Sequence, residues 1–192
     1  MEKNIKIKMI IVLEGLDCTG KDTILESLKQ NLKDFYIVTT ERPEDCSRIE
    51  KLRIKTDYRL LLNTAITNLP KITIFNRFWF SEQVYSIKRG YDALWDNDIM
   101  ELSRILKKHP HIIFYFYNDD DEEMKKRMEK EKEDYLKVEE RKELSNRYNQ
   151  VIGQSMLNIH RINTNMSKEK VLEEVLKIIR EEREKCIKEN KN

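Results

Sequence analysis

Residues 9–23 read MIIVLEGLDCTGKDT, and this stretch decides the fold class of the chain. Residues 5–13 alternate between polar and apolar types and then become fully apolar, which predicts a strand buried on both faces. Apolar side chains then recur at helical spacing, at Ile24, Leu25, Leu28 and Leu32. A buried strand that is joined to an amphipathic helix by a short glycine-bearing turn is typical of α/β proteins.

The turn itself has the spacing Gly-x4-Gly-Lys, from Gly15 through Gly20 to Lys21, which is typical of a phosphate-binding loop. Glycines allow backbone N–H groups to turn inward around a phosphate, and the helix N-terminus adds unpaired donors and a partial positive charge. Lys21 can reach the terminal phosphates. By chance this string is expected about 0.01 times in a chain of this composition. The alternative, an ordinary strand–helix turn, does not require the lysine.

The residue after the lysine departs from the usual motif. Loops of this kind carry Ser or Thr there, and the hydroxyl binds Mg²⁺. This chain has Asp22, followed by Thr23. A carboxylate beside polyphosphate is unfavourable unless a cation lies between them, so Asp22 is a candidate ligand for Mg²⁺. The alternative is that Asp22 points away and is a favourable acid in the first turn of a helix.

Further strands and helices alternate along the chain, which predicts one α/β domain over residues 1–192 with a parallel sheet. A densely charged helical stretch around residues 120–147 is expected to be a lid or a solvated hairpin. Pro70 and Pro110 end the helices before them, and Ser167 is positioned to cap the last helix. We predict strands at 35–38, 72–75, 111–117 and 159–162, and helices at 49–68, 81–89, 96–109, 120–152 and after 167.

Composition excludes several classes of protein. The 37 Lys and Arg residues nearly balance the 35 Asp and Glu residues, so the net charge of +2 argues against a nucleic-acid-binding surface. The chain has three cysteines, an odd number, and they are widely spaced, at Cys18, Cys46 and Cys186. This pattern disfavours a disulfide framework or a zinc site. Apolar runs are too short for a membrane helix, and no signal-peptide cleavage pattern follows the first one. We therefore expect a cytoplasmic protein without membrane or nucleic-acid partners.

The remaining motifs narrow the chemistry. The chain lacks the Asn-Lys-x-Asp string with which GTPases recognise the base. The strand at 111–117 ends in Tyr117-Asn118, without the terminal acid that often holds Mg²⁺ through water in ATPases. The acids that follow, 119–123, are expected in the first turn of a helix. These features favour phosphoryl transfer to a small molecule.

With these motifs in place, the sequence resembles the thymidylate kinase family of nucleoside monophosphate kinases. The phosphate loop from Glu14 to Thr23 is similar to that family's first motif, which has an acid where Asp17 stands. The second motif is matched by Asn76-Arg77-Phe78-Trp79-Phe80-Ser81-Glu82-Gln83-Val84-Tyr85. Weaker similarities are Glu41-Arg42-Pro43, His111 to Arg127, and His160-Arg161-Ile162-Asn163-Thr164.

The resemblance implies a P-loop kinase fold, a five-stranded parallel sheet flanked by helices on both faces, and a homodimer. It also implies ATP and Mg²⁺ as cofactors, with Lys21, Asp17 and Arg77 as the catalytic residues. The ATP phosphates would be held by Gly15, Cys18, Thr19, Gly20, Lys21, Asp22 and Thr23. Asp17 would contact the 3′-hydroxyl of the acceptor sugar, Arg77 and Arg42 would clamp its phosphate, and Tyr85 would lie under the sugar and disfavour a 2′-hydroxyl. Ser81, Glu82 and Gln83 would lie near the base.

The chain departs from the family pattern at several positions. Asn76 stands where the family usually has Asp, and Cys18 stands at one of the two usual places for a catalytic arginine. The lid offers Arg127, Lys130 and Lys132 as replacements. Arg59 is the candidate for the arginine that grips thymine, although Lys55 stands where its partner phenylalanine would be.

Three functions remain open at this point. The first is ATP-dependent phosphorylation of a deoxynucleoside monophosphate, most readily dTMP. The second is a deoxynucleoside kinase, which is weaker because Asn76 cannot act as the base for the 5′-hydroxyl. The third is a catalytically degenerate nucleotide-binding protein, which the departures at Asp22 and Asn76 would explain.

Overall fold

The computed structural model describes residues 8–40, 48–67, 72–89, 96–131 and 136–189. Strands and helices alternate along this part of the chain, with their boundaries close to those that the sequence predicts. The elements are β1 (Met9–Gly15), α1 (Lys21–Asn31), β2 (Phe35–Thr39), α2 (Arg48–Thr67), β3 (Ile72–Asn76), α3 (Trp79–Arg89), α4 (Asp96–Lys107), β4 (His111–Tyr117), α5 (Asp121–Glu131), α6 (Val138–Gly153), β5 (Ile159–Asn163) and α7 (Lys168–Glu189).

The strands form one five-stranded parallel sheet in the order β2-β3-β1-β4-β5, which confirms the predicted fold class. The first strand lies at the centre, and Ile11 pairs with Ile74 of β3 on one side and with Ile112 of β4 on the other. A strand in this position is covered on both faces, which explains why the run at 9–13 is continuously apolar.

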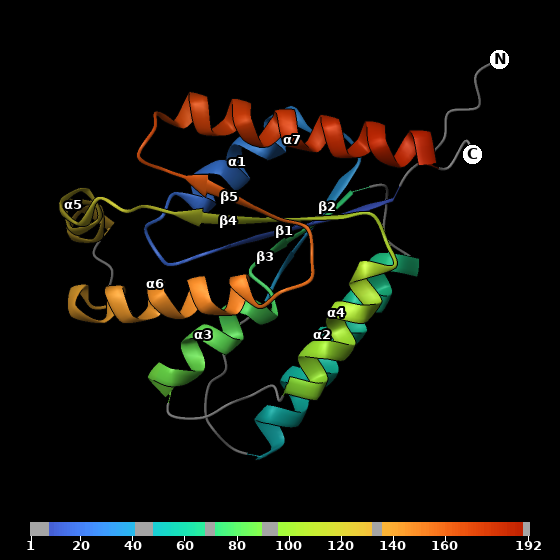
Figure 1. Ribbon diagram of the computed structural model, residues 1–192, viewed down its shortest axis with the longest axis horizontal. Helices are drawn as coiled ribbons and strands as arrows, with labels where there is room; N and C mark the ends of the chain where they lie inside the picture. The colour runs from blue at the N-terminus through green and yellow to red at the C-terminus, as the bar shows by residue number, and fades with distance from the viewer. Residues whose placement is uncertain (1–7, 41–47, 68–71, 90–95, 132–135, 190–192) are drawn as a thin grey trace.

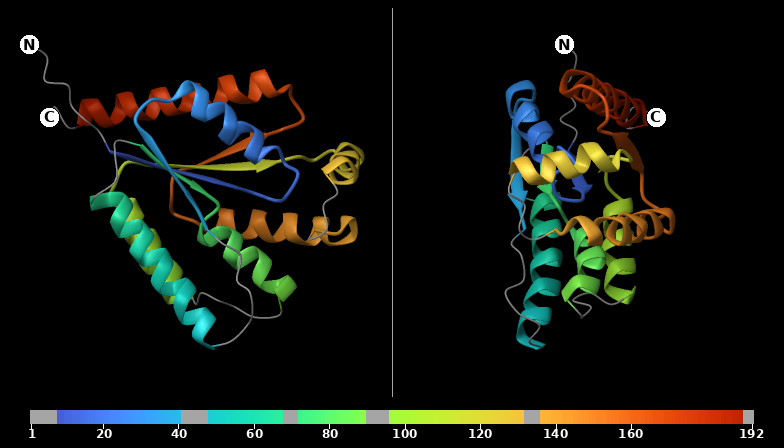
Figure 2. Two further views of the ribbon diagram at one scale, coloured as in Figure 1. Left: turned by 180° about the vertical axis from the view of Figure 1, so that it is seen from behind. Right: turned by 90° about the vertical axis from the view of Figure 1, so that its left-hand side faces the viewer.

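Alternate side chains of β1 enter two separate cores. Met9, Ile11 and Leu13 pack on the face that α1 and α7 cover, against Leu28 and Val175 among others. Residues Ile10 and Val12 face the opposite layer, which contains α2, α3, α4 and α6. Figures 1 and 2 show these two helical layers on either side of the sheet.

The position of the site follows from this arrangement. β1 and β3 are neighbours in the sheet, but the helices that follow them, α1 and α3, lie on opposite faces. Such a divergence opens a crevice at the carboxyl ends of the two strands, where ligands bind in open α/β sheets. The phosphate loop follows β1 and the Asn76 motif follows β3, so both predicted motifs meet at this edge.

The charged stretch predicted as one helical region is two helices, α5 and α6, and residues 132–135 between them lie outside the described residues. In Figure 1, α5 lies beyond the carboxyl edge of the sheet. In the described ranges, no helix is both long enough and apolar enough to cross a membrane.

Candidate active site

The phosphate loop has backbone conformations that require its two glycines. Gly15 has φ +150°, and a Cβ there would lie 2.5 Å from the carbonyl oxygen of Phe116. Gly20 has φ +81° and immediately precedes α1, whose N-terminus receives no side-chain cap from it. The free N–H groups of the first helical turn therefore remain available to an anion, as the motif predicts.

Two other loop residues have distinct roles. Thr19 is buried, and its hydroxyl donates to the carbonyl oxygen of Leu16 at 2.7 Å, so it stabilises the loop from within. Cys18 also has a left-handed backbone, with φ 61°, and it lines the cavity beside the loop. A non-glycine residue in this conformation is uncommon and marks a backbone that its surroundings hold in place.

The Lys21 ammonium lies between the two motifs. Its Nζ donates to Asp22 Oδ1 and to Asn76 Oδ1, each at 2.7 Å, and the side chain is only 3% exposed. Burial, followed by the nearby charge of Arg77, lowers the pKa of Lys21 below its usual value, while Asp22 opposes this shift. Lys21 is therefore a desolvated cation at the carboxyl edge of the sheet, where a phosphate would be attracted strongly.

Asp22 and Asn76 complete this cluster. Asn76 Nδ2 donates to the same Asp22 oxygen, Oδ1, at 3.0 Å. Desolvation acts to raise the pKa of Asp22, but the charge and hydrogen bond of Lys21 outweigh it and hold the pKa below its usual value. The carboxylate is 74% exposed, so it can still reach a cation. Hard oxygen ligands of this kind suit Mg²⁺. The described residues contain no group of three or more His, Cys, Asp or Glu side chains that could hold a metal ion.

Arg77 holds a second cluster together. Its backbone is left-handed, with φ 68°, directly after β3. Its Nη1 donates to the carbonyl oxygen of Gly15 at 2.6 Å, its Nη2 forms an ion pair with Asp17, and its guanidinium lies 5.4 Å from the centre of the Tyr85 ring. The Tyr85 hydroxyl donates to Asp17 Oδ2 at 2.9 Å. The structure thus brings together Asp17, Arg77 and Tyr85, three of the four residues assigned to the acceptor phosphate and sugar.

Both ionisable partners of Asp17 are held in their usual protonation states. Desolvation acts to lower the pKa of Arg77, but Tyr85, Tyr148 and Asp17 together raise it, so Arg77 stays charged. Burial raises the pKa of Tyr85. Tyr85 therefore remains a neutral hydrogen-bond donor, and Arg77 remains a cation with a planar, forked set of donors.

A cavity of about 240 Å³ lies between the end of β2 and the helices α2 and α3. It is lined by Thr39 and Thr40 after β2, by Arg53, Ile54, Asp57, Tyr58, Leu60 and Leu61 of α2, and by Glu82 of α3. Of the residues predicted near the base, Glu82 lines this cavity. Ser81 instead donates to the buried carboxylate of Glu14, and Gln83 lines a different cavity with Trp79 and Met156.

The arginine of α2 that lines the cavity is Arg53, which sequence reasoning missed. Arg59, the predicted one, forms an ion pair with Glu101 of α4. Six residues of α-helix separate two side chains by about 120° around the axis, so Arg53 and Arg59 cannot share a face. The positions of Ile54, Tyr58 and Leu62 mark the buried face and could have shown that the two arginines lie on opposite flanks. Arg42 lies outside the described residues.

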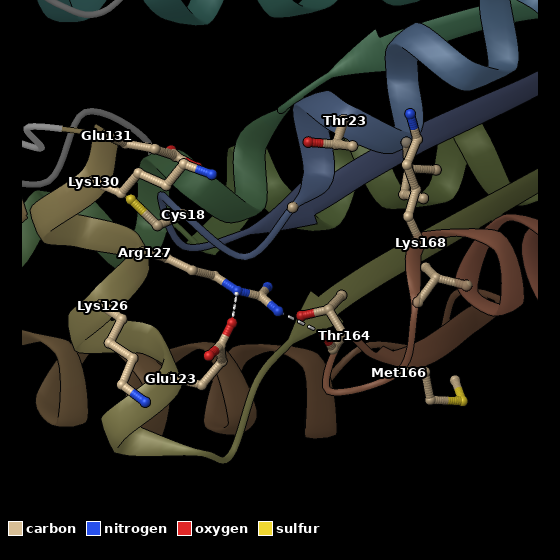
Figure 3. A pocket seen from close by; sticks show the side chains of 13 residues that line it. Cys18, Thr23, Glu123, Lys126, Arg127, Lys130, Glu131, Thr164, Met166 and Lys168 are labelled. Atoms are coloured by element: carbon tan, nitrogen blue, oxygen red, sulfur yellow. Dashed lines mark hydrogen bonds and ion pairs between the residues drawn. The ribbon is translucent and has the colours of Figure 1, made fainter.

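A second cavity of about 350 Å³ lies on the donor side of the loop (Figure 3). Arg127 crosses it: its Nε donates to Glu123 Oε1 at 2.9 Å and its Nη2 to the carbonyl oxygen of Thr164 at 3.1 Å. The lid candidates Arg127 and Lys130 both line it, whereas Lys132 lies outside the described residues. Among the described residues, the lining consists of Cys18, Gly20, Thr23, Ile24, Glu123, Lys126, Arg127, Lys130, Glu131, Thr164, Met166, Lys168 and Val171.

The family to which the sequence is similar is consistent with this geometry. The sequence model of the Polyphosphate kinase 2 (PPK2) family matches residues 1–152, which include the loop, both clusters and helix α5. The chain belongs to the PPK2 family. This PPK2 protein is therefore a kinase-type phosphotransferase, with a site that is suited to nucleotide phosphoryl transfer. The resemblance to thymidylate kinases is confirmed for the fold, and the family that the sequence matches is PPK2.

Solved structures share the fold of this PPK2 protein at low sequence identity. The YorR protein of Bacillus subtilis, crystallised with phosphorylated GDP, is 20% identical with a TM-score of 0.75 over 91% of this chain and 98% of its own. Thymidylate kinase from Candida albicans is 17% identical, with a TM-score of 0.58 and coverage of 92% and 93%. Deoxyadenosine kinase from M. mycoides, with bound dATP, is 16% identical, with a TM-score of 0.61 and coverage of 90% and 100%. A search of curated protein sequences finds no significant match.

Proposed function

We propose that this PPK2-family protein transfers a phosphoryl group from ATP to a deoxynucleoside monophosphate, most readily dTMP. The observation that carries the proposal is the hydrogen bond from Arg77 to the carbonyl oxygen of Gly15. It places the candidate acceptor arginine against the first glycine of the donor phosphate loop. A donor phosphate on the loop and an acceptor phosphate on Arg77 would then be neighbours, as direct transfer requires.

The chemistry of each residue fits this role. Phosphoryl transfer depends mainly on positioning and on stabilising negative charge that spreads over the transferred group. Lys21 and the amides at the start of α1 would hold the donor phosphates, and Arg77 would hold the acceptor phosphate through its planar fork. Asp22 would hold Mg²⁺ directly or through water, and the ion would neutralise part of the phosphate charge.

The lining of the 240 Å³ cavity favours a keto base. Arg53 can only donate hydrogen bonds, whereas the Glu82 carboxylate accepts them. Thymine and guanine each present a ring N–H beside a carbonyl oxygen, which matches this pair, but adenine and cytosine have no ring N–H on that edge. The guanine nucleotide in the YorR structure is consistent with a keto base. The Tyr85 hydroxyl on Asp17 supports a 2′-deoxy sugar, because the ring would lie under that position.

A second candidate donor is inorganic polyphosphate. The PPK2 family is named for this substrate. The 350 Å³ cavity is lined by four cations, Lys126, Arg127, Lys130 and Lys168, and by two acids, Glu123 and Glu131. An excess of cations suits a linear polyanion as well as it suits the phosphates of ATP.

A deoxynucleoside kinase is less well supported. Such an enzyme needs a base for the 5′-hydroxyl, and Asn76 is a neutral amide whose side-chain oxygen already accepts from Lys21. The carboxylate of Asp17 is engaged by Arg77 and Tyr85. A chain that binds ATP without turnover remains the third outcome of the test.

The test is a product assay with the full chain, Mg²⁺ and radiolabelled acceptors, separated by chromatography. Either ATP or polyphosphate is the donor, and the acceptors are dTMP, dGMP, dUMP, dCMP, dAMP, UMP and thymidine. We expect dTDP from ATP as the main product, with dGMP as the next acceptor. Phosphorylation of thymidine alone would make the protein a nucleoside kinase. ATP binding with no product from any acceptor or donor would make it a degenerate binding protein.

A further inference from the structure

The carboxylate of Glu14 is completely buried at the end of β1, directly before the phosphate loop. Its side chain contacts the residues at the start of α3. Oε1 accepts from the backbone N–H groups of Phe78 at 2.8 Å and Ser81 at 3.4 Å. Oε2 accepts from the Ser81 hydroxyl at 2.5 Å and from the Tyr148 hydroxyl at 3.1 Å.

A cap for α3 would not by itself require a buried acid. Ser, Thr or Asn near a helix N-terminus accepts the same backbone hydrogen bonds without placing a carboxyl group in the protein interior. Burial raises the pKa of Glu14, although Ser81, Arg77 and Phe78 oppose the shift. The four groups that contact Glu14 can all act as donors toward it, which is the arrangement that suits the ionised form.

The hydroxyl of Ser81 links Glu14 to Arg77. Ser81 has one hydroxyl hydrogen, and the short bond to Glu14 uses it. Its oxygen is therefore left as an acceptor, and Arg77 Nη1 donates to it at 3.3 Å. Together with the contacts to Gly15 and Asp17, this hydrogen bond fixes the orientation of the Arg77 guanidinium.

Tyr148 adds helix α6 to the same group of contacts. Its side chain is fully buried, and its hydroxyl lies 2.8 Å from Ser81 Oγ and 3.4 Å from the carbonyl oxygen of Gly15. Its ring stacks on that of Tyr115, with the centroids 5.2 Å apart. The hydroxyl is thus held at the point where β1, α3 and the phosphate loop meet.

We propose that Glu14 and Tyr148 are positioning residues that act through Ser81 to hold Arg77 in the orientation that binds the acceptor phosphate. This inference rests on the proposed function, because it assigns the acceptor phosphate to Arg77. It predicts that changes at two buried side chains, which touch neither substrate, weaken acceptor binding selectively.

The variants Glu14→Gln and Tyr148→Phe test this inference, and Tyr115→Phe is the matched control. Tyr115 is buried and stacked on Tyr148, but its hydroxyl bonds to Ser145. We expect Glu14→Gln to raise the KM for the acceptor monophosphate at least tenfold and Tyr148→Phe at least threefold. The KM for the donor should stay within twofold, and Tyr115→Phe should leave both constants within twofold. In an Arg77→Lys background, Glu14→Gln should add less than twofold, because the two residues act in series.

A purely structural role would change both KM values together, or would lower only the melting temperature, and either result overturns the inference. If Arg77→Lys raises the acceptor KM but Glu14→Gln and Tyr148→Phe do not, the inference fails and the proposed function stands. If no acceptor reacts, ¹⁵N NMR of the Arg77 guanidinium decides without substrate. In the wild type, slow rotation of the guanidinium should give separate Nη signals. In the Glu14 and Tyr148 variants these signals should merge, and unchanged signals would refute the inference. Should Glu14→Gln fail to fold, Tyr148→Phe carries the test.

Discussion

Asn76 Nδ2 donates a hydrogen bond to Asp22 Oδ1 at 3.0 Å, across 54 positions of sequence. Both side chains also contact Lys21 Nζ at 2.7 Å. These are two of the positions at which the chain departs from the resembled family, which has a hydroxyl after the lysine and a carboxylate after the strand. Relative to that family pattern, this chain has its carboxylate at position 22 and not at position 76, so the number of charges around Lys21 is the same.

This exchange predicts coupling between the two positions. Asp22→Ser removes the carboxylate that contacts Lys21, and Asn76→Asp places two carboxylates within contact distance, so each should lower activity or raise the Mg²⁺ requirement. The double variant restores one carboxylate and should recover part of the loss. The measurement is kcat/KM as a function of Mg²⁺ for all four proteins. Strictly additive effects would show that the two positions act independently.

Lys21 should be required for turnover. Removing its buried ammonium leaves the developing phosphoryl charge without its cation, so Lys21→Ala should lower kcat on the order of 100-fold or more. Lys29→Ala is a suitable control, because Lys29 lies in the last turn of the same helix and is 40% exposed beside Glu26. Near-normal turnover by Lys21→Ala would show that the loop does not bind the donor phosphates during catalysis.

Arg77 should require the fork of its guanidinium as well as its charge. Arg77→Lys keeps one positive charge but loses the simultaneous contacts to Gly15, Asp17 and Ser81. We expect the KM for the acceptor monophosphate to rise at least tenfold in steady-state assays, with thymidine a poor acceptor for both proteins. An unchanged acceptor KM would assign the acceptor phosphate to another residue.

The two arginines of α2 should behave differently. Arg53 lines the 240 Å³ cavity, whereas Arg59 pairs with Glu101 on another face of the helix. Arg53→Ala should therefore lower kcat/KM for dTMP by about tenfold, equivalent to about 1.4 kcal/mol. Arg59→Ala removes an exposed ion pair of small energetic value and should change activity less than twofold. If Arg59→Ala lowers kcat/KM more than Arg53→Ala does, the base binds on the side of α2 that faces α4.

Tyr85 should control the choice of sugar. We expect the wild type to prefer dUMP over UMP by at least tenfold in kcat/KM, because the ring would occupy the space of a 2′-hydroxyl. Tyr85→Ala should relax this preference, and Tyr85→Phe should keep it, since the ring remains although the hydroxyl and its 2.9 Å bond to Asp17 are lost. Equal rates with dUMP and UMP in the wild type would contradict the assignment.

The local features of this protein could be predicted from sequence. The apolar run at 9–13 predicted a strand with two buried faces, and the spacing of Gly15, Gly20 and Lys21 predicted the loop. Proline and cap residues predicted helix boundaries, such as the end of α4 before Pro110. All of these properties depend on neighbours within a few residues, where backbone hydrogen bonding and hydrophobic periodicity decide the conformation.

Other features depend on how distant segments pack. The contact of Asn76 with Asp22, the burial of Glu14 beneath α3, and the hydroxyl of Tyr148 at the phosphate loop join residues from 54 to 134 positions apart. The choice of Arg53 over Arg59 depended on which flank of α2 faces the cavity and which faces α4. Sequence alone therefore determined the fold class and the donor loop. Only the tertiary structure decided which side chains meet there, because side-chain contacts follow from strand order and helix rotation, which no local pattern specifies.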